Sequence, residues 1–484
     1  MRAGVFPWYN TLDMEETRVR HKPRSFERDV FEMPEQAADL GKGRTFFIHT
    51  YGCQANVRDG ETLAGMLVNM GFTEAMDVDD ADLVIFNTCA VRKAAEDHVF
   101  GEIGNLKHRK EKDPEKIFAL CGCMAQMPAV VERIRTAYPQ IDLVFGTHNL
   151  DRFPALLQDF LAERERTFAV ESIPGSVIEN LPVQRSSAYK GFVNIMYGCD
   201  KFCTYCIVPY TRGRERSRMM DDIIREVQEF KEAGGKEVTL LGQNVNAYGK
   251  DLGMEDGFTD LLNACADTGI DRIRFYSSHP RDYTVSSIEA MRNRRNIMPA
   301  LHLPVQSGNN EVLRRMNRGY RIERFYELFD DMKARIPDMT FTTDLIVGFP
   351  DETDEQFEDT LKLVDYCRFD LAYTFIFSPR EGTPAAGYPD SIPLQVKKER
   401  LQTLNDRISK YARQKNQGYI GKELLVLCDG PSKKNPDTYA GYSEENKLVN
   451  FTGRNIQEGD FVKVEITDAK SYTLDGRAVE RNGV

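Results

Sequence analysis

The sequence predicts an α/β protein with an N-terminal parallel α/β domain, a central partial barrel of six βα units and a small C-terminal all-β barrel. The chain has 484 residues, more than one hydrophobic core usually organises. From Arg44 to about residue 417, apolar strand-like runs alternate with amphipathic helical patterns, as in parallel sheets covered by helices. Beyond that point the runs are short and separated by Gly, Pro and Asn turns, which is typical of a small β barrel.

These patterns also suggest where the segments begin and end. Residues 1–43 are charged and weakly periodic, and we assign them no chemistry. We expect an N-terminal extension at 1–43, a first domain at 44–160, a linker at 161–184, a central domain at 185–415 and a C-terminal barrel at 418–484.

The composition narrows the class of protein. Hydrophobic residues make up 41% and charged residues 29% of the chain, as in soluble globular proteins. No apolar run reaches the roughly 18 residues of a membrane-spanning helix, and no secretory signal begins the chain, so a cytoplasmic location is expected. The net charge of −11 argues against a non-specific nucleic-acid binder, although it allows a local basic surface.

The chain has ten cysteines, and structural disulfides are rare in the reducing compartment expected for it. Clustered cysteines there indicate metal binding or catalysis. Cys265, Cys367 and Cys428 stand alone in apolar segments and are interpreted as ordinary buried thiols.

In the first domain, three cysteines follow apolar strands. Cys53 follows RTFFIHTYG, Cys89 ends ADLVIFNTC and Cys123 ends KIFALCGC. Parallel strands bring their carboxyl ends together, and thiolates without histidine favour an iron–sulfur cluster. Cys121 is an alternative to Cys123, which we prefer because it lies closer to the turn. Three unrelated buried thiols are the competing interpretation.

The central domain contains six predicted strands and a closing helix at 396–417. A full (βα)8 barrel would need eight βα units, so a partial barrel is expected. The strands are GFVNIMYG, EVTLLGQ, RIRFYSS, ALHLPVQ, FTTDLIVGF and LAYTFIFS.

A cysteine motif directly follows the first of these strands. GCDKFCTYC carries Cys199, Cys203 and Cys206, and three thiolates can bind three irons of a cubane [4Fe–4S] cluster. The fourth iron stays open to a small molecule. A zinc site is the alternative, but zinc usually has four ligands and the next histidine is His279.

This motif resembles that of the radical S-adenosylmethionine (SAM) superfamily. With TYGCQAN, NTCAVR and LLGQNVNAYG, residues 44 to 484 resemble the methylthiotransferase family, whose C-terminal barrel is a TRAM domain. The Tyr-Gly-Cys-Gln form is most similar to the branch that modifies N6-dimethylallyl(isopentenyl)adenosine at position 37 of tRNA. The threonylcarbamoyl-adenosine branch tends to have Leu-Gly-Cys-Lys, and the ribosomal-protein branch usually lacks the Tyr-Gly-Cys-Gln form.

The resemblance implies the reaction and its cofactors. The six cysteines Cys53, Cys89, Cys123, Cys199, Cys203 and Cys206 would hold two [4Fe–4S] clusters, and two SAM molecules would be used per turnover. A radical formed from SAM would activate C2 of the base, and sulfur and a SAM-derived methyl group would be added there. The implied partners are the tRNA anticodon loop, an electron donor such as flavodoxin or ferredoxin, and a sulfur donor, with the enzyme acting as a monomer.

The resemblance also implies residues that contact SAM, although a purely structural role is an equally good interpretation of each one. These residues are Tyr205, Gln243, Asn244, His302, Gln306, Asp344, Gly348 and Glu352.

Basic residues fit an RNA partner because arginine suits phosphate contacts and base stacking. Solvated charged faces are the competing interpretation. The candidates are Arg212, Arg214, Arg216 and Arg218 beside the cysteine motif, then Arg314, Arg315, Arg318 and Arg321, and Lys433, Lys434 and Lys447 in the barrel.

Two other functions stay open. One is a methylthiotransferase acting on threonylcarbamoyl-adenosine tRNA or a ribosomal protein. The other is a non-catalytic iron–sulfur RNA-binding or redox protein, which would produce no 5′-deoxyadenosine from SAM.

Overall fold

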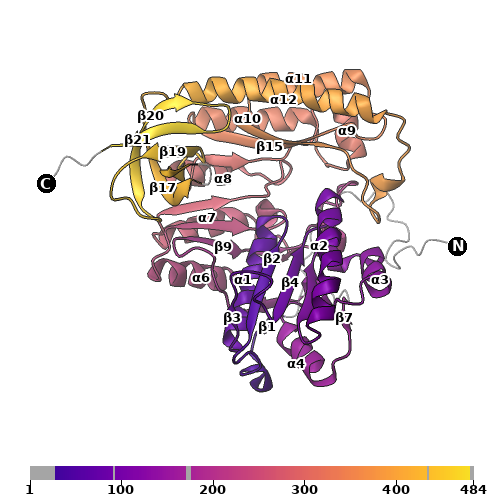
Figure 1. The fold of residues 1–484 in the computed structure, drawn as a ribbon. Coiled ribbons are helices and arrows are strands. Elements are labelled where there is room, and N and C mark those ends of the chain that lie inside the picture. The colour runs from indigo at the N-terminus through magenta and orange to yellow at the C-terminus, as the bar shows by residue number, and fades with distance from the viewer. Residues whose placement is uncertain (1–27, 91–92, 171–175, 433–434, 480–484) are drawn as a thin grey trace.

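A computed structural model describes residues 28–90, 93–170, 176–432 and 435–479. It confirms the predicted α/β fold class with its three successive units (Figure 1). Most of the predicted extension, together with Lys433 and Lys434, lies outside the described residues.

The N-terminal domain is a six-stranded parallel sheet with strand order β3-β2-β4-β5-β6-β7. Helices cover both faces, so β4, β5 and β6 are buried and mainly apolar, as expected for a doubly wound sheet. The core on one face contains α1 and α4, and that on the other contains α2 and α3. The elements are β2 Thr45–Thr50, α1 Gln54–Asn69, β3 Thr73–Glu74, β4 Leu83–Thr88, α2 Lys93–Lys112, β5 Ile117–Gly122, α3 Pro128–Ala137, β6 Leu143–Phe145, α4 Phe153–Glu163 and β7 Thr167–Ala169.

The region predicted as a linker contains two strands. β7 completes the N-terminal sheet beside β6, whereas β8, Val177–Glu179, pairs in parallel with β1, Arg28–Val30, from the predicted extension. The end of the extension is thereby tied to the segment that enters the central domain.

The central domain places its six parallel strands in two three-stranded sheets that share one apolar core. An isolated bridge joins Ile273 of the first sheet to Ile297, which lies just before the first strand of the second sheet. Its strands are β9 Lys190–Asn194, β12 Glu237–Leu241, β13 Arg272–Phe275, β14 Ala300–His302, β15 Thr340–Val347 and β16 Leu371–Ile376. Its helices include α6 Met220–Glu232, α7 Gly257–Asp267, α8 Val285–Asn293, α10 Ile322–Arg335, α11 Asp354–Cys367 and α12 Leu394–Gln417.

Shorter elements surround the cysteine motif. β10, Met196–Tyr197, pairs antiparallel with β11, Arg216–Ser217. Helix α5, Val208–Thr211, follows the motif, and helix α9, Asn310–Arg315, packs nearby.

The C-terminal unit is a closed five-stranded barrel with strand order β17-β18-β19-β21-β20. Arg272 of β13 donates hydrogen bonds to the carbonyl oxygens of Tyr442 and Leu425, at 2.9 and 2.7 Å. Arg274 donates to the carbonyl of Ser443 at 2.7 Å. The barrel is therefore attached directly to the central sheet. Its strands are β17 Glu423–Ser432, β18 Asn435–Ser443, β19 Leu448–Thr452, β20 Phe461–Ala469 and β21 Leu474–Ala478.

Among the helices of the described residues, none is long and apolar enough to cross a membrane.

Candidate functional site

The loop carrying Cys199, Cys203 and Cys206 is fixed by backbone hydrogen bonds at the mouth of the central barrel. The Cys206 amide donates to the carbonyl of Cys203 at 2.9 Å, and the Thr204 amide donates to Met316 at 3.0 Å. Gly198 has a φ of +74°, and a Cβ there would lie 2.1 Å from the carbonyl oxygen of Arg214. Only glycine therefore fits before Cys199.

The thiols of this loop influence one another. Burial raises the pKa of Cys199 well above its usual value, and Glu215, Cys203 and Cys206 raise it further. Burial also raises the pKa of Cys206 to about 12, with an added contribution from Cys203. Three neighbouring thiols on one loop need cationic compensation to become thiolates together, and iron supplies it.

Among the described residues, no group of three His, Cys, Asp or Glu side chains is arranged to hold a single metal ion. A cubane cluster places a different iron on each thiolate, so it does not require that arrangement. Three neighbouring thiols on one loop fit such a cluster.

Unsatisfied polar atoms lie beside this loop, and they fit a polar ligand such as SAM. Asn244 Oδ1, Asn246 Nδ2 and Ser278 Oγ are buried without a hydrogen-bond partner, as are His279 Nε2 and Arg318 Nε. Buried polar groups are normally paired, so a concentration of exceptions indicates a missing partner. Asn246, Ser278 and His279 are not among the predicted ligand contacts, although their position after the ends of β12 and β13 is a recognisable signal.

The first-domain cysteines lie at the carboxyl ends of three neighbouring strands. Cys53 precedes α1, Cys89 follows β4 and Cys123 follows β5. Asn56 donates from Nδ2 to the carbonyl of Thr88 at 2.8 Å, which holds the start of α1 against the end of β4. A Cβ on Gly52 would lie 2.4 Å from Cys89 Cβ, so the Cys53 loop is packed against Cys89.

Cys121 and Cys123 have different surroundings. Cys121 is buried in the core between the sheet and the helices α1 and α4. Cys123 Sγ accepts a hydrogen bond of 3.2 Å from Arg212 Nε. Burial raises the pKa of Cys123, Arg212 lowers it, and Cys53 raises it again, which indicates that Cys53 lies near. Cys123 therefore lies beside Arg212 and near Cys53, whereas Cys121 lies in the core.

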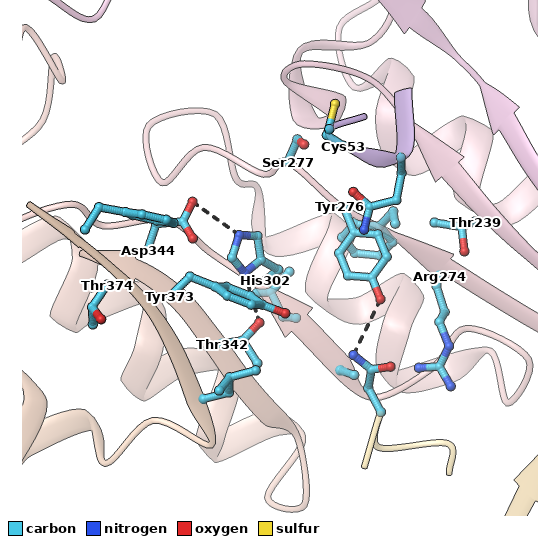
Figure 2. Close-up of a pocket in the computed structure, with 18 of the residues that line it drawn as sticks. Cys53, Thr239, Arg274, Tyr276, Ser277, His302, Thr342, Asp344, Tyr373 and Thr374 are labelled. Atoms are coloured by element: carbon cyan, nitrogen blue, oxygen red, sulfur yellow. Dashed lines mark hydrogen bonds and ion pairs between the residues drawn. The ribbon is translucent and has the colours of Figure 1, made fainter. Parts of the chain in front are cut away.

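One cavity of about 1430 Å³ connects the two cysteine sites and continues toward the C-terminal barrel. Cys53 and Cys89 line it from the first domain, Cys206 lines it from the central loop, and Tyr442 lines it from the barrel. Figure 2 shows Cys53 and side chains of the central strands around this space. A substrate in the cavity could thus reach both sites.

Four of the predicted SAM-contacting residues line this cavity: Tyr205, His302, Gln306 and Asp344. His302 Nδ1 lies 2.9 Å from Thr342 Oγ1, and its Nε2 lies 3.6 Å from Asp344 Oδ2 (Figure 2).

The other four predicted residues do not line the cavity. Gln243 Oε1 accepts a hydrogen bond from the amide of Gly198, and Asn244 donates to Asp282 at 2.8 Å. Glu352 accepts from the amide of Gly348 at 2.8 Å and pairs with Arg400 at 3.0 Å. Gln243, Asn244 and Glu352 therefore have hydrogen-bond partners within the chain, although Asn244 Oδ1 itself has none.

The structure corrects the expectation of an exposed arginine surface at 212–218. Arg212, Arg216 and Arg218 are at most 7% exposed. Arg212 pairs with Asp59, whereas Arg218 pairs with Glu179 and Glu226. These carboxylates lie far away in sequence, so the pattern alone could not reveal them. Arg214 remains half-exposed, paired with Asp200 at 2.6 Å.

The arginines predicted at 314–321 also differ in exposure, so they do not form one surface. Arg314 and Arg321 are exposed and paired with Glu311 and Glu323, while Arg315 lies over the Phe349 ring. Arg318 is 5% exposed and contacts the cysteine loop, so it is not a surface residue. In the barrel, Lys447 is buried and pairs with Asp370 at 2.7 Å.

Comparison with known proteins identifies each unit. The radical SAM superfamily matches residues 193–364, the uncharacterized protein family UPF0004 matches 45–146 and the TRAM domain matches 417–479. The radical SAM match implies a [4Fe–4S] cluster and SAM.

Solved structures show the same fold at low identity. The radical SAM methyltransferase TsrM of Kitasatospora setae, solved with cobalamin and a [4Fe-4S] cluster, has a TM-score of 0.51 and 13% identity, and the match covers 71% of this chain and 76% of that one.

The chain also has curated relatives over nearly its full length. The tRNA-2-methylthio-N(6)-dimethylallyladenosine synthase of Bacillus cytotoxicus is 50% identical over 98% of this chain and 93% of the relative. The synthase of the same name from Bacillus subtilis is 50% identical over 97% and 93%. The chain therefore belongs to the radical SAM methylthiotransferase family of the tRNA-2-methylthio-N(6)-dimethylallyladenosine synthases.

Proposed function

We propose that this protein methylthiolates C2 of N6-dimethylallyladenosine at position 37 of tRNA, giving 2-methylthio-N6-dimethylallyladenosine. The observation that carries the proposal is the single cavity lined by cysteines of both sites. The near-full-length identity to synthases of that name supports the choice of substrate. The reaction takes place in the cytoplasm, where the tRNA is.

Two [4Fe–4S] clusters would be held in this proposal, one by Cys199, Cys203 and Cys206 and the other by Cys53, Cys89 and Cys123. When bound, the first cluster and SAM supply the 5′-deoxyadenosyl radical, and the second cluster supplies the sulfur. An aromatic C–H bond offers no handle for acid–base catalysis, so the chemistry belongs to the cofactors. The chain positions them around one cavity.

The cavity walls suit a base that has left its loop. Tyr276 and Tyr373 both lie near His302, with ring centroids 6.5 and 5.8 Å from it (Figure 2). Exposed aromatic faces bind unstacked bases, and an enzyme that acts on a base must expose it. Phosphate contacts are proposed for Arg214 and Arg314, which retain exposure. The further partners are an electron donor of the flavodoxin or ferredoxin type and a sulfur donor, and the enzyme acts as a monomer.

The decisive experiment is nucleoside analysis of tRNA from a strain lacking this gene. The expected result is loss of 2-methylthio-N6-dimethylallyladenosine, accumulation of N6-dimethylallyladenosine and recovery on complementation. Unchanged methylthio-adenosine, with a ribosomal protein lacking its methylthio group instead, would overturn the proposed substrate.

Iron counting tests the second cluster separately. After anaerobic reconstitution, about eight irons per chain are expected, falling to about four when Cys53, Cys89 and Cys123 are all changed to Ala. Cys121→Ala is the matched control, because Cys121 lies in the core, and it should keep about eight. About four irons in the unaltered protein would contradict a second cluster.

A further inference from the structure

Each cysteine site receives one hydrogen bond from a buried arginine. Arg318 Nη1 donates to Cys203 Sγ at 3.3 Å, and Arg212 Nε donates to Cys123 Sγ at 3.2 Å. The two arginines are 5% and 6% exposed. Their sulfur contacts are alike, so any difference between them lies in the rest of their surroundings.

The two guanidinium groups differ in charge compensation. Arg212 Nη2 donates to Asp59 Oδ2 at 2.6 Å, so this pair carries almost no net charge. Within the described ranges, Arg318 forms no ion pair with a carboxylate. Its other hydrogen bonds go to neutral groups, the carbonyl of Pro304 at 2.6 Å and the hydroxyl of Tyr205 at 3.4 Å.

The position of Arg318 is built into the backbone around the cysteine loop. The Arg318 amide donates to the carbonyl of Leu313 at 2.9 Å, and Asn317, at a φ of +54°, donates from Nδ2 to the carbonyl of Phe202 at 3.0 Å. The Thr204 amide donates back to Met316. Reciprocal bonds therefore hold the arginine against the loop.

An unpaired buried cation favours negative charge on its neighbours, because a low-dielectric interior screens it weakly. A cluster becomes more negative when it takes up an electron, and its potential responds to net charge and to hydrogen bonds at its sulfurs. We propose that Arg318 is a positioning residue that raises the reduction potential of the cluster on Cys199, Cys203 and Cys206 through its uncompensated charge at Cys203. Arg212, neutralised by Asp59, has no comparable effect at Cys123.

The test is a potentiometric titration followed by EPR spectroscopy, without SAM. It uses the full chain carrying Cys53→Ala, Cys89→Ala and Cys123→Ala, so that only one cluster is observed. Arg318→Gln should shift the midpoint to more negative potential, and a smaller fraction should be reduced at a fixed dithionite dose. Arg314→Gln, which removes an exposed charge from the neighbouring helix α9, should leave the midpoint unchanged.

Arg318→Lys separates charge from structure. Lysine retains the positive charge but not the planar guanidinium geometry. The midpoint potential of the Arg318→Lys variant should therefore lie close to that of the protein with Arg318. If the Gln variant binds no iron, the Lys variant still decides. An unchanged midpoint in Arg318→Gln with full iron content would overturn the proposal, and so would a Lys midpoint well below that of the arginine protein.

The second arm concerns Arg212 and rests on the proposed second cluster. In a chain with Cys199, Cys203 and Cys206 changed to Ala, Asp59→Asn frees the Arg212 charge and should raise the midpoint of the remaining cluster. Iron counting before the titration distinguishes a failure of the second-cluster proposal from a failure of the charge argument. Absence of iron in this background refutes the second cluster, whereas iron with an unmoved midpoint refutes the charge argument.

Discussion

The two cysteine sites are built in opposite ways. Cys199, Cys203 and Cys206 lie on one loop, which is bonded within itself and to other segments of the same domain, such as Gly213 and Met316. Cys53, Cys89 and Cys123 come from three strand ends, and the arginine at Cys123 comes from the central domain. The first site is assembled within one domain, whereas the second requires an intact sheet and a docked neighbouring domain. Changes at the interface between domains should therefore damage the second site more than the first.

The largest expected effect is that changes at the two cysteine sites abolish different products. Cys203→Ala should abolish both 5′-deoxyadenosine and the methylthiolated nucleoside, because the proposed radical source is lost. Cys53→Ala should abolish only the nucleoside and leave SAM cleavage by dithionite-reduced enzyme. Chromatography of both products checks this, and loss of 5′-deoxyadenosine in Cys53→Ala would show that the sites are not separable.

The next effect concerns the link between the domains. Arg212→Gln leaves Asp59 buried without its cation, and breaking such a pair costs about 3 to 5 kcal/mol. The change should lower the unfolding midpoint of the N-terminal domain. Adding Asp59→Asn should restore part of the loss, because no unpaired charge then remains.

Calorimetry of the two single variants and the double variant measures this coupling. Strictly additive losses would show that the 2.6 Å contact contributes little.

A smaller effect is expected from the aromatic wall of the cavity. Tyr373→Ala should raise the KM for tRNA roughly tenfold with little change in 5′-deoxyadenosine formation, since stacking of one base contributes about 1 to 3 kcal/mol. Tyr366→Ala is the matched control, because Tyr366 is exposed on α11, bonds Asp330 and does not line the cavity. Equal KM values for the two variants would exclude Tyr373 as a substrate contact.

The smallest effect concerns pH and Glu352. Burial raises the pKa of Glu352 to about 7, against the opposing influence of the Gly348 amide and Arg400. The folded state thus binds a proton that the unfolded state has released above about pH 4.5. Protonation of Glu352 therefore stabilises the folded state fully below about pH 4.5, and this contribution is lost as the pH rises through about 7.

Glu352→Gln should remove this dependence. The difference in free energy of unfolding between the variant and the unaltered protein should be roughly 1 to 3 kcal/mol more favourable to the variant at pH 8 than at pH 5. Thermal unfolding at the two pH values measures it, and an identical pH slope in both proteins would contradict the raised pKa.

The sequence was a good guide wherever local pattern determines structure. The strands of the central domain and the turn-rich C-terminal strands follow from apolar periodicity and turn residues. Closeness to the turn favours Cys123 over Cys121 as a ligand, and this preference stays a prediction; the structure adds a hydrogen bond from Arg212 to Cys123.

Interactions between distant segments were not predictable. The pairing of β1 with β8 joins residues far apart in the chain. The arginines at 212 and 218 resemble a surface patch until Asp59 and Glu226 are seen beside them. A charge pattern reports what a side chain carries but not which carboxylate the fold brings to it.

The bonds from Arg272 and Arg274 to the C-terminal barrel have a mechanical consequence. A TRAM barrel on a loose tether would hold RNA at variable distances from the cavity. Because the barrel is bonded to β13 of the central sheet, the barrel lies at a fixed distance from the cavity. It would measure a set length along a bound tRNA, and only a nucleotide at that distance from the gripped region would reach the cavity.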